Sequence, residues 1–109
     1  MKNKIAQQTA QQGDVVLRRI KSLPEGEQKV IARKKLILAE GEVTGHYHGI
    51  EEEDSELIQI GDKILMNLAN TATLTHQEHG PITLEPGLWE VGRVQEYDYY
   101  AKMKRQVQD

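Results

Sequence analysis

The four histidines of this chain fall into two short clusters that could form one site. His46 and His48 lie in the stretch GEVTGHYHGI, and His76 and His79 lie in LTHQEHGPI. Neutral imidazole nitrogens are good ligands for zinc, copper, iron and nickel. Because the chain has no cysteine, a soft-metal site must be built from histidine. The spacing therefore predicts a transition-metal site that uses His46, His48, His76 and His79.

The two clusters make different demands on the backbone. Residues two apart on an extended strand point to the same face, so His46 and His48 can present both imidazoles to one ligand. Residues three apart point to opposite faces, so His76 and His79 need a bend, which the Gly-Pro pair that follows them can supply. Both clusters are expected at strand ends beside bends, where binding residues concentrate.

Other side chains could complete or replace a metal site. Glu78, between the second pair, could be a ligand or orient an imidazole. Arg18 and Arg93 could bind an anionic or nucleotide ligand, because a guanidinium matches phosphate geometry, and Trp89 could stack on a base. The structural alternatives are solvent-exposed arginines, a core tryptophan, and histidines that form hydrogen bonds across a turn. These interpretations stay open at the level of the sequence.

Short strands are expected to position these residues. Runs such as VVLRRI, TATLTH and PITL are rich in β-branched or aliphatic residues, and LIQIGDKILMNLA has the pattern of a hairpin. The segment ARKK is expected to form a turn between two strands, and EEEDSE an acidic loop. About seven or eight short strands predict a mainly β fold, a small antiparallel β-barrel or jelly-roll-like sandwich.

The same pattern sets the expected domain limits. Residues 13–98 are predicted to form the β domain. Residues 1–12, rich in Gln and without apolar periodicity, are expected to be a flexible N-terminal arm. Residues 99–109 are expected to form a C-terminal tail or a short helix.

Composition narrows the function classes. A chain of 109 residues fits one domain with a modest core. Its net charge of −3, with 14 basic and 17 acidic residues interspersed, argues against broad nucleic-acid binding. The apolar runs are too short to span a bilayer, so no membrane association is expected. A cytoplasmic setting is expected instead. Neither a phosphate-binding glycine loop nor a nucleophile elbow is present, so nucleophilic hydrolase chemistry has no support.

Several ordered motifs carry a family resemblance. The succession QGDVVL, LPEG, LAEGEVTGHYHGI, LTHQEHGPITLEPGLWEV and RVQEY resembles a family of small, functionally unassigned β proteins found in phage, prophage and some bacterial genomes. This resemblance implies a phage-type accessory or virion-associated protein, in the host cytoplasm or the virion. Its partners would be further copies of itself, as a homo-oligomer, or phage structural proteins.

A weaker resemblance is to the cupins. It lies in the His-x-His element, the Glu52 that follows, the later histidine pair and the Pro-Gly turn, although here the later histidines precede that turn. It implies a metal bound by a His-x-His pair, the Glu that follows and a later His inside a double-stranded β-helix.

The function favoured by the sequence is a non-enzymatic accessory β-domain that binds a transition metal, or a small anionic or nucleotide ligand, through the paired histidines. Zinc is the expected metal, with iron, nickel or copper as alternatives. One alternative is a virion structural protein, such as a capsid decoration or a tail-associated piece. Another is a cupin-like metalloenzyme in which Glu78 or Glu52 acts as acid and base.

Overall fold

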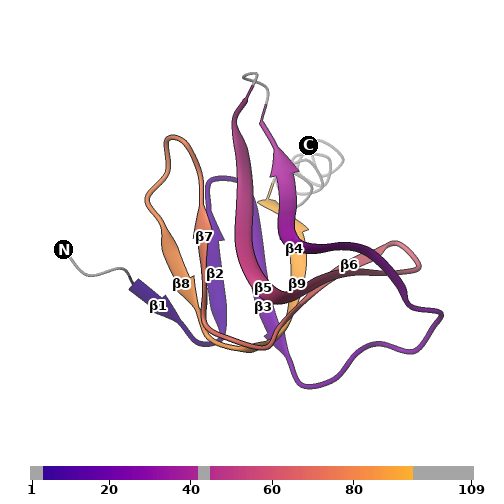
Figure 1. The fold of residues 1–109 in the computed structure, drawn as a ribbon. Coiled ribbons are helices and arrows are strands. Elements are labelled where there is room, and N and C mark those ends of the chain that lie inside the picture. The colour runs from indigo at the N-terminus through magenta and orange to yellow at the C-terminus, as the bar shows by residue number, and fades with distance from the viewer. Residues whose placement is uncertain (1–3, 42–44, 95–109) are drawn as a thin grey trace, which may run out of the picture.

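The computed structural model describes residues 4–41 and 45–94, and these residues form nine strands (Figure 1). The strands are β1 Lys4–Ala6, β2 Thr9–Gln12, β3 Val15–Ile20, β4 Lys29–Glu40, β5 Tyr47–Ile60, β6 Lys63–Leu68, β7 Ala72–Thr75, β8 Ile82–Leu84 and β9 Gly87–Arg93. Within the described ranges, no helix has the length and apolar character needed to cross a membrane. The helix expected at 99–109 lies outside them.

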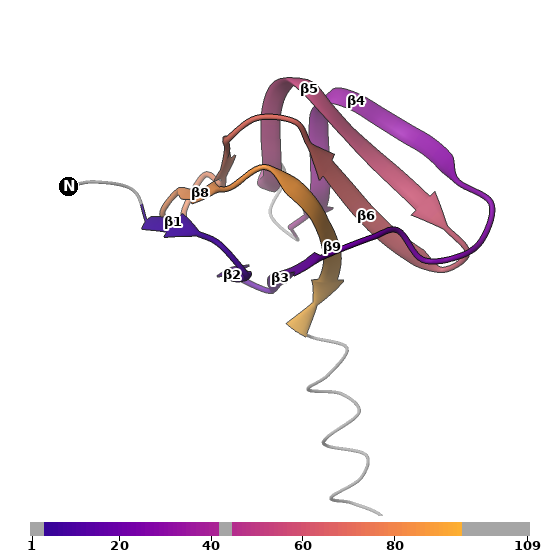
Figure 2. The same ribbon diagram turned by 90° about the horizontal axis from the view of Figure 1, so that it is seen from below.

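The strands curve around a common interior as a nearly closed antiparallel β-barrel (Figure 2). Their order is β1-β8-β7-β5-β6-β9-β3-β2, and β4 pairs with the other edge of β5. The pairs are antiparallel except β1 with β8. The mainly β fold class predicted from the sequence is therefore confirmed. Among the described residues no ladder joins β2 to β1 or to β8, so the barrel has a seam between the two ends of this order.

The core consists of aliphatic side chains packed around one tryptophan. Trp89 is fully buried, and its indole N–H donates a hydrogen bond of 3.0 Å to the Glu85 carbonyl. Fully buried aliphatic and thioether residues of the same cluster come from most strands: Val15, Leu17, Leu36, Ile50, Met66, Leu68, Leu74 and Leu84. Burial of this kind is the main favourable contribution to folding.

Three segments differ from the elements expected from the sequence. The N-terminal arm contains two strands, because β1 pairs with β8 and β2 pairs with β3. The ARKK segment is part of the continuous strand β4, where Lys34 has a φ of 68° and bulges absorb the irregularity. The acidic EEEDSE segment belongs to β5. Two of its five carboxylates form ion pairs across the ladder to β4, Arg33–Glu56 at 3.0 Å and Lys34–Glu53 at 3.6 Å.

Two hairpins are built on the same dipeptide. Gly13-Asp14 joins β2 to β3, and Gly61-Asp62 joins β5 to β6. Each turn has two residues, because Gln12 pairs with Val15 in the first and Ile60 pairs with Lys63 in the second. The glycines have φ values of 57° and 62°, which a residue with a Cβ adopts only with strain. The first of these turns lies at the seam.

Candidate functional site

The structure brings the two histidine clusters together at the start of β5. Gly49 of β5 pairs with Thr75 of β7, so the segment with His46 and His48 lies beside the turn that carries His76 and His79. His76 is at the centre of the four rings. Its ring centroid lies 4.3 Å from that of His48, 4.7 Å from that of His79 and 5.6 Å from that of His46. These four side chains are called the histidine group below.

A buried glutamine holds His48 in place. Gln12 is 2% exposed, and its side-chain NH2 donates hydrogen bonds to the carbonyls of Leu74, at 3.1 Å, and Gly80, at 2.8 Å. Its Oε1 lies 2.9 Å from Nδ1 of His48. These contacts connect β2 to β5, to β7 and to the loop after β7, so a side chain bridges the seam where no strand ladder does.

The contacts of Gln12 determine the tautomer of His48. The amide cannot be flipped, because its oxygen would then face two carbonyl oxygens. Its Oε1 is therefore the acceptor, and His48 Nδ1 must carry the proton that it donates. In the neutral ring the proton is on Nδ1, so Nε2 keeps its lone pair. Such a hydrogen bond on one nitrogen is how proteins orient a histidine whose other nitrogen binds a metal.

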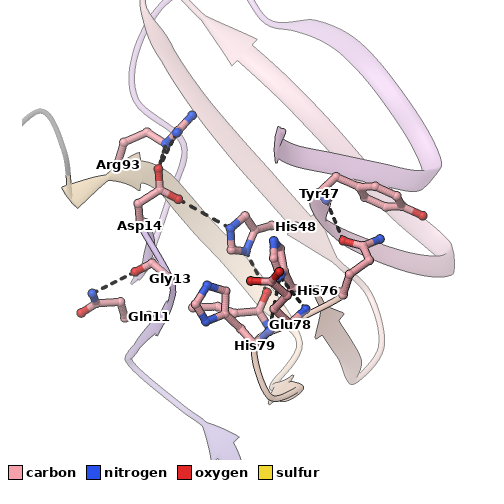
Figure 3. Close-up of polar contacts among 11 residues, drawn as sticks. Gln11, Gly13, Asp14, Tyr47, His48, His76, Glu78, His79 and Arg93 are labelled. Carbon is pink, nitrogen blue, oxygen red and sulfur yellow. Dashed lines mark hydrogen bonds and ion pairs between the residues drawn. The ribbon is translucent and has the colours of Figure 1, made fainter. Parts of the chain in front are cut away.

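Asp14 faces that lone pair. Its Oδ1 lies 3.5 Å from His48 Nε2, while its Oδ2 accepts a hydrogen bond of 2.9 Å from Arg93 Nε and a second, short contact from an Arg93 terminal nitrogen (Figure 3). Arg93 thus fixes the orientation of the carboxylate. Asp14 and Arg93 come from opposite ends of the sequence and meet because Val15 pairs with Arg93 in the β3–β9 ladder.

Burial and neighbouring charges shift the pKa of both groups. Burial, and then the nearby His76 ring, lower the pKa of His48 below its ordinary value, although the Asp14 carboxylate opposes the shift. For Asp14, burial raises the pKa, but the hydrogen bond and charge of Arg93 outweigh it and the net pKa is lowered. At neutral pH the pair is therefore a neutral imidazole beside an ionised carboxylate.

The other histidines have more specific local contacts. His76 Nδ1 accepts backbone hydrogen bonds from Glu78, at 3.0 Å, and His79, at 3.3 Å, so it shapes the turn and its proton belongs on Nε2. His46 Nδ1 lies 3.5 Å from Glu78 Oε1. This places the predicted candidate Glu78 beside the group. His79 is solvent-exposed.

The first Gly-Asp turn packs directly against the group. A Cβ atom on Gly13 would lie 2.7 Å from His79 Nε2 and 3.1 Å from His48 Cε1. Only glycine allows the turn to approach the imidazoles this closely. The turn is therefore part of the wall of the site.

Charge around the group favours a cation. The carboxylates of Asp14 and Glu78 contact imidazoles, and the guanidinium of Arg93 compensates one of them. With neutral imidazoles this leaves one net negative charge. In the described ranges, no three histidine or carboxylate side chains already surround a common point as metal ligands do. A metal would therefore require side-chain rotations.

Two other predicted ligand-binding residues have different environments. Trp89 is fully buried in the core, so it is not accessible for stacking on a base. Arg18 is exposed and forms an ion pair of 2.7 Å with Glu90, a neighbour across the β3–β9 ladder. Arg93 does lie at the group, but its guanidinium contacts Asp14.

The sequence motifs do not point to Gln12, Gly13 or Asp14. They place Gln12 in an arm expected to be flexible and Gly13-Asp14 at the start of the β domain. One signal was available, since Gly-Asp between runs of strand-forming residues predicts a hairpin. That hairpin would have placed Gln12 in a strand.

Comparison with known proteins gives one match. No curated protein and no solved structure matches the chain. A family of uncharacterised domains matches residues 11–94, a range that includes the histidine group, Gln12, Asp14 and Arg93. The chain therefore belongs to the family described as "Domain of unknown function (DUF8820)".

Proposed function

We propose that this domain binds one divalent transition-metal ion, zinc being the first choice, through the histidine group, as a binding module and not as an enzyme. The observation that carries the proposal is the state of His48. Its Nδ1–H is committed to Gln12, so its Nε2 offers a lone pair toward a space that other imidazoles and a carboxylate also border. Neutral imidazoles held in this way are typical first-row metal ligands.

The ring spacing supports this proposal. Metal–nitrogen bonds of about 2.0–2.1 Å in a tetrahedral site place the centres of ligating imidazoles roughly 5 Å apart. Four of the six pairs of ring centroids in the group are separated by 4.3 to 5.9 Å. Rotation of side chains, led by the exposed His79, can therefore complete a coordination sphere without moving the strands. His76 is the weakest donor, because its Nδ1 caps the turn and its Nε2 carries the proton.

Electrostatics favours this proposal over an anionic or nucleotide ligand. With neutral imidazoles, the charges of Asp14, Glu78 and Arg93 beside the histidine group sum to one net negative charge. This charge repels phosphate and attracts a cation. The nearby arginine, Arg93, already contacts a carboxylate. A phosphate would have to displace Asp14 to use it.

Metal titration of the full chain tests the proposal. Tag-free protein is stripped with a chelator and titrated calorimetrically with zinc, nickel and copper(II) chlorides. We expect about one equivalent of zinc per chain, and a loss of at least tenfold in affinity in His48→Ala and His79→Ala. Arg18→Ala is the control and should bind as the unmodified protein does.

Two results would contradict the proposal. One is uptake below about a tenth of an equivalent for all three metals by folded protein. The other is tight binding of ATP or inorganic phosphate that Arg93→Ala abolishes while no metal binds, which would establish the anionic interpretation. Circular dichroism of each variant checks that the β fold is intact.

The phage accessory context, homo-oligomer formation and a virion structural role remain predictions from the resemblance. The cupin-like enzyme also remains a prediction, and its two acid–base candidates differ in position. Glu78 borders the histidine group, whereas the Glu52 carboxylate accepts a hydrogen bond of 3.2 Å from Asn70. The geometry therefore favours Glu78 if a metal-bound water has a base.

A further inference from the structure

We infer that Asp14 is a ligand of the proposed metal ion, alongside His48, and that Gln12 is the positioning residue that keeps His48 Nε2 available to it. This inference rests on the proposed function. It adds Asp14 to the histidines and Glu78 that the sequence predicts, and it assigns a role to a buried glutamine. The metal is thus held where the β2–β3 turn meets the start of β5.

The distance between His48 Nε2 and Asp14 Oδ1 fits two ligands of one metal ion. At 3.5 Å it is long for a hydrogen bond. Two ligand atoms that each lie about 2.0–2.1 Å from a tetrahedral zinc are roughly 3.3 Å apart. The two atoms are therefore already separated almost as they would be on either side of a shared ion.

The tautomer of His48 places a lone pair opposite the Asp14 carboxylate. Gln12 requires the proton of His48 on Nδ1, so the atom that faces the carboxylate oxygen is itself a lone-pair acceptor. His48 is buried and Asp14 is half-buried, and two acceptors that face each other in such a setting are stabilised by a cation between them. A metal ion satisfies both at once.

The Asp14 carboxylate is held in a fixed orientation by Arg93. Arg93 contacts Oδ2 of Asp14 with two nitrogens and leaves Oδ1 on the side of His48. This support lowers the conformational cost of binding, because the carboxylate is oriented before the ion arrives. A mixed imidazole and carboxylate set suits divalent zinc or iron and disfavours copper(I), which selects sulfur ligands.

A matched pair of variants tests the role of Asp14. Asp14→Asn removes the charge with little change in shape, and Asp62→Asn makes the same change in the other Gly-Asp turn. We expect zinc affinity to fall at least tenfold in Asp14→Asn and to stay within about twofold in Asp62→Asn. Thermal unfolding of both variants checks that they fold.

The outcomes separate this inference from the proposed function. If the unmodified protein binds no metal, the proposed function fails and this inference fails with it. If the unmodified protein binds zinc and folded Asp14→Asn binds it equally well, only the inference about Asp14 is overturned. If both Asn variants weaken binding equally, a general charge effect replaces a ligand role.

A tautomer measurement tests the role of Gln12 without any metal. Nitrogen-15 NMR of the metal-free protein near pH 7.5 should show the His48 proton on Nδ1. In Gln12→Met, which keeps the shape but removes the acceptor, the two tautomers should mix and zinc affinity should fall. A His48 with its proton on Nε2 in the unmodified protein overturns the positioning role, and this result does not depend on whether Gln12→Met folds.

Discussion

Two turns of this barrel share a local sequence and differ in what surrounds them. Gln11 to Asp14 reads Gln-Gln-Gly-Asp, and Gln59 to Asp62 reads Gln-Ile-Gly-Asp. In both turns the first glutamine donates a side-chain hydrogen bond to the glycine carbonyl, at 3.1 Å and 3.3 Å. The glycine φ values are 57° and 62°. The two turns are nearly the same local structure.

The two turns differ in the residue before the Gly-Asp dipeptide, which is Gln12 in the first turn and Ile60 in the second. Ile60 is 5% exposed and packs in a small apolar cluster, whereas Gln12, at 2% exposed, forms three side-chain hydrogen bonds, two of them buried. A Cβ on Gly61 would contact nothing within 4 Å, but one on Gly13 would meet two imidazoles. The same dipeptide therefore makes an ordinary hairpin at one place and packs against the histidine group at the other. The difference arises from the seam, where side chains replace a strand ladder.

The largest effect is expected from making the first turn like the second. Gln12→Ile leaves the Leu74 and Gly80 carbonyls and the His48 Nδ1–H without their present partner in the interior. The free energy of unfolding should fall by about 3 kcal/mol, measured by urea denaturation. A loss below about 1 kcal/mol would mean that water replaces the amide and that the seam does not depend on Gln12.

Alanine in place of the two turn glycines gives the next comparison. Both Gly13→Ala and Gly61→Ala place a Cβ in the left-handed region, which costs about 1–2 kcal/mol. Only Gly13→Ala also displaces His79, so zinc affinity should fall in that variant and stay unchanged in Gly61→Ala. Calorimetric titration of the two proteins measures this, and equal affinities would place His79 outside the metal site.

A pH titration of stability should report His48. Its folded pKa is lowered, so the unfolded chain, with a histidine pKa near 6.5, takes up its proton first as the pH falls. Stability should therefore be fully present above about pH 7 and decrease below pH 6.5. His48→Gln should flatten this part of the curve in metal-free protein. An unchanged curve would show that His48 does not contribute to acid destabilisation.

The smallest effect is expected from the first glutamines of the two turns. Gln11 and Gln59 each donate one hydrogen bond at the surface, so each alanine variant should lose about 0.5 kcal/mol of stability and retain zinc binding. Thermal unfolding compares them. A clearly larger loss for Gln11→Ala would mean that the outer side of the first turn also supports the site.

The strands were predictable where turn residues separate aliphatic runs. The hairpin at Gly61-Asp62 is the clearest example, because apolar residues flank a dipeptide that favours a tight turn. The continuity of β4 was not predictable from ARKK, since its basic residues are held by acidic partners on β5. Likewise, β1 and β2 form because β8 and β3 accept them, and a polar sequence does not reveal such tertiary partners.

For the site, spacing alone was enough to single out the four histidines, but not their partners. Gln12 and Asp14 belong to a segment far from either histidine cluster in sequence, and only the closing of the barrel brings them to His48. Which nitrogen of each imidazole carries the proton also depends on contacts that cannot be predicted from the spacing of the histidines. Only the tertiary structure therefore shows that Gln12 and Asp14 hold His48 and face its free nitrogen.

Anomalous diffraction at the zinc edge, from crystals of the zinc-loaded protein, would locate the bound ion itself. We expect one strong peak per chain between His48 and Asp14, with His48 Nε2 and Asp14 Oδ1 each about 2.0–2.2 Å from the ion and Gln12 still bonded to Nδ1. A peak elsewhere on the barrel, or a zinc bound through His48 Nδ1 with Gln12 displaced, would contradict it.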